Sequence, residues 1–214
     1  RGAAMKLGQL ISLQGEDVLP PEFAQALGVL RSSAAPMPSA QLHRVLGREY
    51  GKGWERRFAG FSEEPIAAAS IGQVHRARTR DGRELALKIQ YPGVARSIAS
   101  DVDNVAALLR VANVLPLGID VRGIAKEAKR QLQQESDYIA ESRFLEKYAM
   151  LVADDPDLLV PRVHWDFTTP RVMAMDFVEG VPLEEMARDD VPQSQRDKLG
   201  TVLEYLTFRE LFEF

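Results

Sequence analysis

Residues 65–93 read PIAAASIGQVHRARTRDGRELALKIQYPG, and this stretch decides the fold. It is typical of a β-hairpin, with a first strand over residues 71–79 and a second over residues 84–90. The turn at 80–83 contains an Asp-Gly dipeptide, which favours tight hairpin connections. We therefore expect an antiparallel pair of strands at the centre of the protein.

The second strand of this hairpin carries a lysine in its middle. Leu85, Leu87 and Ile89 alternate with Ala86 and Lys88, so the two sets point to opposite faces. Lysine is rarely buried unless it is paired. The order Ala-Leu-Lys-Ile is similar to the kinase strand whose lysine reaches the nucleotide phosphates. From this segment alone, a surface strand with a solvated lysine remains an equal alternative.

Bulk composition indicates an ordinary soluble globular protein of one large or two small domains. The chain has 214 residues, of which 45% are hydrophobic and 27% charged, with a net charge of −4. This charge gives no reason to expect nucleic-acid binding. The absence of cysteine excludes disulfides and thiolate catalysis, and the three histidines show no metal-ligand spacing. We find neither a signal peptide nor an apolar run of about 18 residues.

Both ends of the sequence fall within helical patterns, so we interpret it as part of a longer chain. Helices are expected over residues 2–14 and 22–31, with a third beginning at Ser39 as N-cap. The remaining expected elements follow in order: a strand at 61–66, a bend at 67–69, the hairpin, helices at 94–114 and 121–152, strands at 160–165 and 171–178, and a final helix from Pro192.

The helix expected over residues 121–152 places an acid among apolar residues. Glu135 shares a stripe with Leu132 and Ile139, so its carboxylate must find a cation or take a raised pKa. Asp137 and Glu141 lie on another face, where solvation is the simpler interpretation.

Several segments match the motifs of one family in order: Lys6-Leu7-Gly8-Gln9, Ala67-Ala68-Ala69-Ser70, Ala86-Leu87-Lys88, Glu135-Ser136-Asp137-Tyr138, Glu141 and the closing residues 209–214. On these motifs the chain resembles the UbiB/AarF family of atypical protein-kinase-like proteins, which is tied to coenzyme Q (ubiquinone) biosynthesis. The resemblance runs nearly from end to end.

The resemblance implies an α+β fold. Residues 1–58 would form a helical extension with the K-x-G-Q motif. Residues 59–180 would form a kinase-like N-lobe, with a small antiparallel sheet, an alanine-rich loop and two inserted long helices. Residues 181–214 would begin a helical C-lobe.

The resemblance also implies roles for particular residues. Lys88 would contact ATP phosphates and be held by Glu141. The rest of the ATP site would comprise Ala67, Ala68, Ala69 and Ser70 of the loop, Ala86 against the adenine, and the hinge at Asp176 and Val178. An occluding, regulatory set would comprise Lys6, Gly8 and Gln9 on the first helix, with Glu135 and Asp137 opposite; Lys6 would pair with Glu135.

The implied cofactor is ATP with Mg²⁺, but the family's catalytic-loop residues and metal-binding Asp are expected beyond Phe214. The chain as given therefore has no catalytic or metal-ligating residue assigned, and we expect no phosphoryl transfer from it alone.

The implied partners are ATP or ADP, a prenyl-quinone lipid or membrane surface, and ubiquinone-biosynthesis proteins. The location would be membrane-associated in a bacterial cytoplasm, or the matrix side of the mitochondrial inner membrane. The alternative function is a non-catalytic lipid-binding or scaffold protein.

Overall fold

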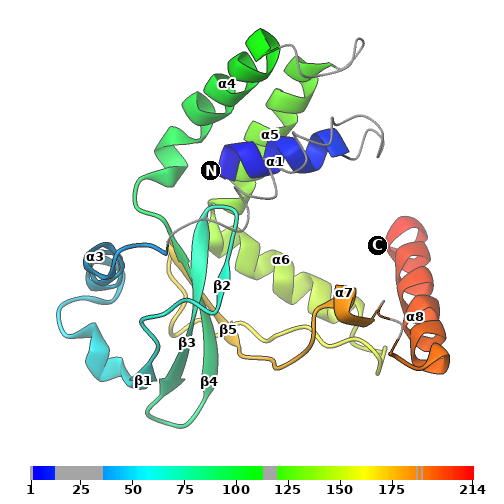
Figure 1. The fold of residues 1–214 in the computed structure, drawn as a ribbon. Coiled ribbons are helices and arrows are strands. Elements are labelled where there is room, and N and C mark those ends of the chain that lie inside the picture. Colours follow the sequence, from blue (N-terminus) through cyan, green and yellow to red (C-terminus); the bar gives the residue numbers. More distant parts are fainter. Residues whose placement is uncertain (1, 13–35, 113–119, 187, 189) are drawn as a thin grey trace.

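The computed structural model describes residues 2–12, 36–112, 120–186, 188 and 190–214, and has the expected mixture of helices and a small antiparallel sheet (Figure 1). The elements in chain order are α1 (Gly2–Ser12), α3 (Ser39–Tyr50), the 3-10 helix η2 (Trp54–Arg57), β1 (Phe58–Phe61), β2 (Ala67–Ala68), β3 (Gly72–Thr79), β4 (Glu84–Gln90), α4 (Val94–Ala112), α5 (Val121–Glu135), α6 (Tyr138–Leu151), β5 (Val172–Asp176), α7 (Leu183–Met186) and α8 (Gln193–Phe212). The predicted helix over residues 22–31 lies outside the described residues.

The β3–β4 hairpin forms as the sequence predicts, and the sheet is built on it. The strands run β1-β3-β4-β5 in space, with β2 also paired to β3, and every pairing is antiparallel. In the hairpin turn, the Thr79 N–H donates to the Arg83 carbonyl at 2.9 Å. Gly82 has a φ of +90°, which glycine adopts without steric cost.

Alternation along β4 divides the two faces of the sheet as predicted. Leu85, Leu87 and Ile89 are fully buried in one apolar cluster, which includes Leu42 and Leu46 of α3. Burying each of these side chains contributes roughly 1.5–3 kcal/mol. The opposite face, with Ala86 and Lys88, therefore remains available to the helical layer and to solvent.

A second apolar cluster joins α1, α4, α5 and α6 to that opposite side. Its members include Ala3, Leu7, Ile98, Val102, Ala128, Leu132, Tyr138 and Met173. Helix α1 packs against both α4 and α5, and Figure 1 shows it crossing α5. This packing places the K-x-G-Q helix next to the end of α5.

The single helix predicted over residues 121–152 is wrong, because the chain breaks it at Ser136 and Asp137. Ser136 closes α5 through N–H bonds to the carbonyls of Leu132 and Gln133, at 3.0 and 3.2 Å. The Asp137 carboxylate then accepts from the Ala140 N–H at 3.0 Å and caps α6. Ile139 consequently belongs to a different helix from Glu135.

The prediction around residues 61–69 is also corrected. The strand expected over 61–66 is replaced by β1, which ends at Phe61, and by a turn in which the Ser62 hydroxyl donates to the Glu64 carbonyl at 2.8 Å. The bend expected at 67–69 is instead the short strand β2, paired with β3. The reversal lies one step later, where the Ala69 N–H donates to the Gly72 carbonyl at 3.0 Å.

Two smaller predictions fail for identifiable reasons. No regular strand forms over residues 160–165; the segment makes a single bridge, Val163 to Met175, because Pro161 has no N–H to donate. Ser39 is the first residue of α3 rather than its N-cap, which is Pro38. The Ser39 hydroxyl instead donates to Glu63.

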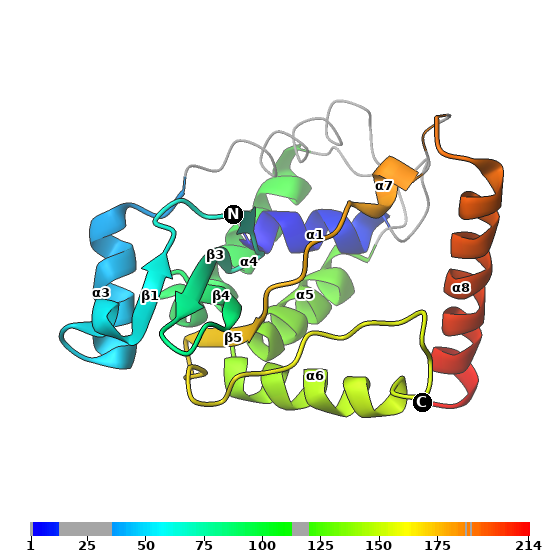
Figure 2. The same cartoon turned by 90° about the horizontal axis from the view of Figure 1, so that it is seen from below.

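The final helix begins after Pro192 as predicted and stands at the far end of α6 (Figure 2). Its anchor is Arg209, which is 8% exposed. The guanidinium donates to the Leu151 carbonyl and to Asp154, both at 3.1 Å. The end of α6 and the last turn of α8 are thereby fastened together.

Candidate functional site

The centre of the candidate site is an ion pair between β4 and α6. Lys88 Nζ lies 2.5 Å from Glu141 Oε1, and the two side chains are 14% and 31% exposed. Lys88 points to this side because of its place in the strand, and the Asp137 cap fixes where α6 begins. The solvated-lysine alternative is excluded, since the ammonium has a specific partner in a partly buried setting.

The Lys88 ammonium has a second neighbour that sequence reasoning did not single out. The ring centroid of Tyr138 lies 4.9 Å from Lys88 Nζ. Tyr138 is fully buried, and in the sequence it is marked only by its place directly after the E-x-D motif. No local pattern shows that a residue at a helix start will face a strand lysine, so only the tertiary structure could reveal it.

A second charge cluster links three elements at the carboxylate of Glu135. Lys6 Nζ lies 2.7 Å from Oε1, and the Ser70 hydroxyl donates to Oε2. Burial disfavours the charged carboxylate, but the hydrogen bonds from Lys6 and Ser70 outweigh it, so the pKa of Glu135 lies below its ordinary value. One acid thus holds both α1 and the residue that follows the alanine triplet.

The other residues of the expected occluding set are placed less directly. Gly8 is buried within α1, where the absence of a side chain suits the close packing of helices. Gln9 belongs to the same helix, but its side chain is outside the described part. The contact that the structure describes for the Asp137 side chain is the cap of α6, and this side chain is exposed.

The expected hinge lies where β5 ends. The Asp176 carboxylate accepts from His164 Nε2 at 2.7 Å and from the Arg162 N–H at 3.1 Å. Burial opposes ionisation, but these two bonds hold the pKa of Asp176 below its usual value. Within the described part of the chain, neither backbone group of Val178 has a hydrogen-bond partner. The Asp176 side chain therefore fixes the strand end.

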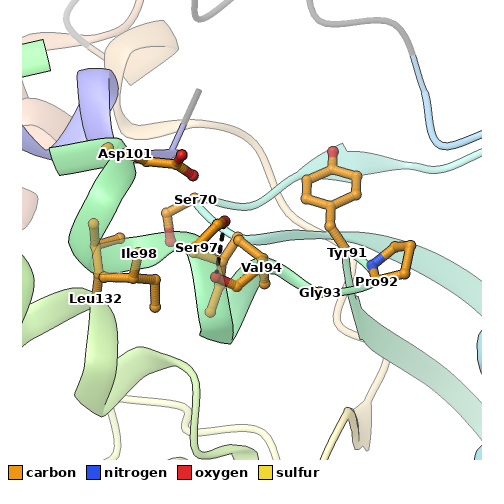
Figure 3. A pocket seen from close by; sticks show the side chains of 11 residues that line it. Ser70, Tyr91, Pro92, Gly93, Val94, Ser97, Ile98, Asp101 and Leu132 are labelled. Carbon is orange, nitrogen blue, oxygen red and sulfur yellow. Dashed lines mark hydrogen bonds between the residues drawn. The ribbon is translucent and has the colours of Figure 1, made fainter. Parts of the chain in front are cut away.

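The alanine-rich segment ends at Ser70, which lines a cavity. Ala67 and Ala68 are exposed, whereas Ala69 and Ser70 are half-buried. Figure 3 shows Ser70 beside the first turn of α4, at a pocket of about 390 Å³ that Tyr91 and Asp101 also line. This pocket is separate from the one at Lys88.

Lys88 and Glu141 open into a pocket of about 540 Å³. Its other lining residues come from α6 and β5 and are mainly apolar: Phe144, Leu145, Lys147, Tyr148, Leu151, Met173 and Met175. The side-chain ammonium of Lys88 beside an apolar wall suits an anionic ligand that also has a flat, weakly polar part. Among the described residues, no group of three or more His, Cys, Asp or Glu could hold a metal ion.

The sheet, the helix that pairs with its lysine, and the strand end beside the pocket define a protein-kinase-like small lobe. The ABC1 atypical kinase-like domain matches residues 29–214. The chain therefore belongs to the ABC1 atypical kinase-like family, which confirms the kinship predicted from the motifs.

Individual relatives agree with this assignment. Atypical kinase coq-8, mitochondrial, of Caenorhabditis elegans is 40% identical over 212 residues, covering 99% of this chain and 28% of its own length. Atypical kinase COQ8B, mitochondrial, of Danio rerio is 40% identical over 214 residues, covering 100% of this chain and 34% of its own length. This chain thus spans about a third of the length of these curated relatives.

A solved structure also matches. It is the complex of Rv3197 with erythromycin from Mycobacterium tuberculosis, with a TM-score of 0.64 and 38% sequence identity. The match covers 97% of this chain and 52% of that one. In the part of the chain that the structure describes, no helix combines the length and apolar character needed to cross a bilayer.

Proposed function

We propose that this chain is the nucleotide-binding small lobe of an ABC1-type atypical kinase or ATPase that supports ubiquinone biosynthesis. The ligand would be ATP or ADP. The observation that carries the proposal is the Lys88–Glu141 pair, 2.5 Å apart at the mouth of a pocket. A strand lysine held by a helical glutamate is the arrangement by which kinases position a lysine for nucleotide phosphates.

The surroundings of Lys88 support the same ligand. Ala86 lies on the same face of β4 and is small enough to leave room for a flat ring. The backbone of Val178 offers one donor and one acceptor near the end of β5, as adenine recognition requires. Ala67–Ala68 and the turn after it would border the phosphates. Mg²⁺ would accompany ATP, although the described residues include no cluster of acids or histidines that could hold it.

We propose a regulatory role for α1. Its Lys6 binds Glu135, and Glu135 also binds Ser70 beside the alanine-rich strand. A helix fastened at this point would lie across the substrate side of the lobe. Release of Lys6 would then alter both the access of a substrate and the freedom of the loop.

Titration calorimetry with MgATP and with ADP tests the proposal. We expect the chain to bind nucleotide, and Lys88→Met to weaken binding by about 10- to 100-fold, since a hydrogen bond to a charged group contributes roughly 1.5–3 kcal/mol. Lys198→Met is the matched control, because Lys198 pairs with Asp157 at 2.8 Å on an exposed surface. Equal binding by the wild type and Lys88→Met would refute this site.

A non-catalytic lipid-binding or scaffold role is the second candidate, and one observation favours it. Helix α8 exposes Phe208, Leu211 and Phe212, at 53%, 70% and 75%. Exposed apolar groups of this kind mark interaction surfaces. A prenyl-quinone or a membrane surface is the partner we propose, with the protein at the bacterial or mitochondrial inner membrane. Sedimentation with quinone-containing vesicles, in the absence of nucleotide binding, would favour this role over the first.

A further inference from the structure

The two charge clusters of the lobe lie on either side of one buried aromatic residue. Glu135 ends α5, Tyr138 begins α6, and Glu141 follows one turn later. Tyr138 is fully buried and belongs to the apolar cluster that contains Leu132 and Met173. Its position is therefore fixed by packing, independently of any ligand.

The ring of Tyr138 presents a face to the ammonium of Lys88. The distance from Nζ to the ring centroid is 4.9 Å, within the range over which a cation is attracted to the electron-rich face of an aromatic ring. Burial and the nearby acids Glu141 and Glu135 raise the pKa of Tyr138 well above its ordinary range, so the ring stays a neutral phenol. A neutral ring attracts the ammonium without neutralising it.

The ring of Tyr138, and not its hydroxyl, is the group that attracts the Lys88 ammonium. The hydroxyl is buried and, within the described part of the chain, has no hydrogen-bond partner. It lies against β3 at Gly72, where a Cβ would come within 2.9 Å of it. The ring alone is thus available to act on Lys88, while the hydroxyl only occupies space.

An ammonium has three N–H donors in a fixed arrangement. One of them points to Glu141 at 2.5 Å, and the Tyr138 ring lies on a second side. Lys88 also lines the pocket of about 540 Å³. The nearby carboxylate of Glu135 is already occupied by Lys6 and Ser70, so it competes only weakly for Lys88.

We propose that Tyr138 is a positioning residue, which holds the Lys88 ammonium by the face of its ring so that one N–H side stays directed at an anionic ligand. The ligand side of this inference rests on the proposed nucleotide function. The positioning itself concerns only groups of the free chain and can be measured without nucleotide.

Nuclear magnetic resonance of the chain labelled with ¹³C at the lysine ε carbon measures this positioning. Lys88→Arg assigns the signal. We expect the Lys88 ε protons to be displaced upfield by the ring, with a nuclear Overhauser contact to the Tyr138 ring protons in the wild type. Tyr138→Phe should keep the displacement, and both Tyr138→Leu and Tyr138→Met should lose it.

The wild-type contact needs no variant, so the measurement stands even where a substitution unfolds the chain. Absence of that contact, or an unchanged Lys88 signal in a folded Tyr138→Leu or Tyr138→Met variant, would overturn the proposal and leave Tyr138 as core packing only.

Calorimetry with ADP then measures the consequence for ligand binding. Tyr138→Phe should bind as the wild type does, and Tyr138→Met about 10-fold more weakly, a loss of roughly 1.4 kcal/mol. Equal ADP binding by folded Tyr138→Met and the wild type would overturn the ligand side of the proposal. A wild type that binds no nucleotide would refute the proposed function, whereas the resonance result would still decide the positioning.

Discussion

Replacing Lys6 by methionine should destabilise the protein more than the loss of an ordinary surface ion pair. The Lys6 and Glu135 side chains are 17% and 27% exposed, and their charged atoms lie 2.7 Å apart. Exposed pairs contribute at most about 1 kcal/mol, whereas removing one partner of a buried pair costs about 3–5 kcal/mol. This pair is intermediate, and Glu135 keeps its bond from Ser70, so we expect a loss of about 2 kcal/mol in the free energy of unfolding.

Thermal and urea melts at pH 7 provide the measurement. For a chain of this size, a loss of about 2 kcal/mol lowers the melting temperature by roughly 4–8 °C. Lys129→Met is the control, because Lys129 also lies between α5 and a neighbouring helix, paired with Asp103 at 2.6 Å, but Asp103 is 63% exposed. We expect that control to cost less than about 1 kcal/mol.

The double variant Lys6→Met with Glu135→Leu decides whether the two charges act on each other. It should recover much of the loss, because no buried carboxylate is left without its cation. The free energy of unfolding of the double variant should remain about 1 kcal/mol below that of the wild type, since the Ser70 hydroxyl loses its acceptor. Strictly additive losses from the two single changes would refute the reasoning, since they would mean that the side chains do not interact in solution.

Further predictions concern titration and backbone fit. The pKa of Glu135 is lower in the folded chain than its ordinary 4.5. The stability advantage of the wild type over Glu135→Gln should therefore be fully present above pH 4.5 and shrink as the pH falls through the folded pKa. In urea melts, a difference in unfolding free energy between the two proteins that stays constant from pH 7 to pH 3 would contradict this. Gly72→Ala should lose about 1–3 kcal/mol in urea melts, because its Cβ would collide with the Ile89 carbonyl and the Tyr138 hydroxyl, whereas Gly200→Ala, with nothing near its Cβ, should not destabilise. Asp137→Ala should cost about 0.5–2 kcal/mol by removing the cap of α6, and Asp137→Asn should restore most of it; equal stability of all three proteins would exclude the cap.

Local sequence was sufficient for the hairpin, because a strand has a period of two and the Asp81-Gly82 turn fixes its register. The same alternation correctly assigned Lys88 to the face opposite Leu87. The partner of Lys88 was not deducible in this way, because Glu141 lies 53 residues further along the chain. Its expected role came from the family resemblance alone.

The sequence around Glu135 indicated an ion pair more directly than the sequence around Glu141 did. A carboxylate next to Leu132 on an apolar stripe must find a cation or take a raised pKa, and the structure shows the first outcome, with Lys6 as the cation. The second donor, Ser70, was not predicted. A hydroxyl in a loop can bond to many groups, so only the tertiary contact between the loop and α5 identifies its acceptor.

The failures share a physical cause, which is that a local interruption was hidden inside a favourable pattern. Pro161 lies within an apolar run that otherwise suits a strand, yet it removes a ladder donor. At Asp137, the apolar spacing continues from Leu132 to Ile139 as though through one helix, while Ser136 closes α5 and the Asp137 carboxylate caps α6.

The hidden break between α5 and α6 also explains how two acids reach two lysines. In one continuous helix, residues 135 and 141 would project about 120° apart around the axis. The break at Ser136 and Asp137 removes that constraint, so Glu135 can meet Lys6 of α1 while Glu141 meets Lys88 of β4. Asp137 then acts on the site without contacting a ligand, because its cap sets where α6 starts and therefore where Glu141 points.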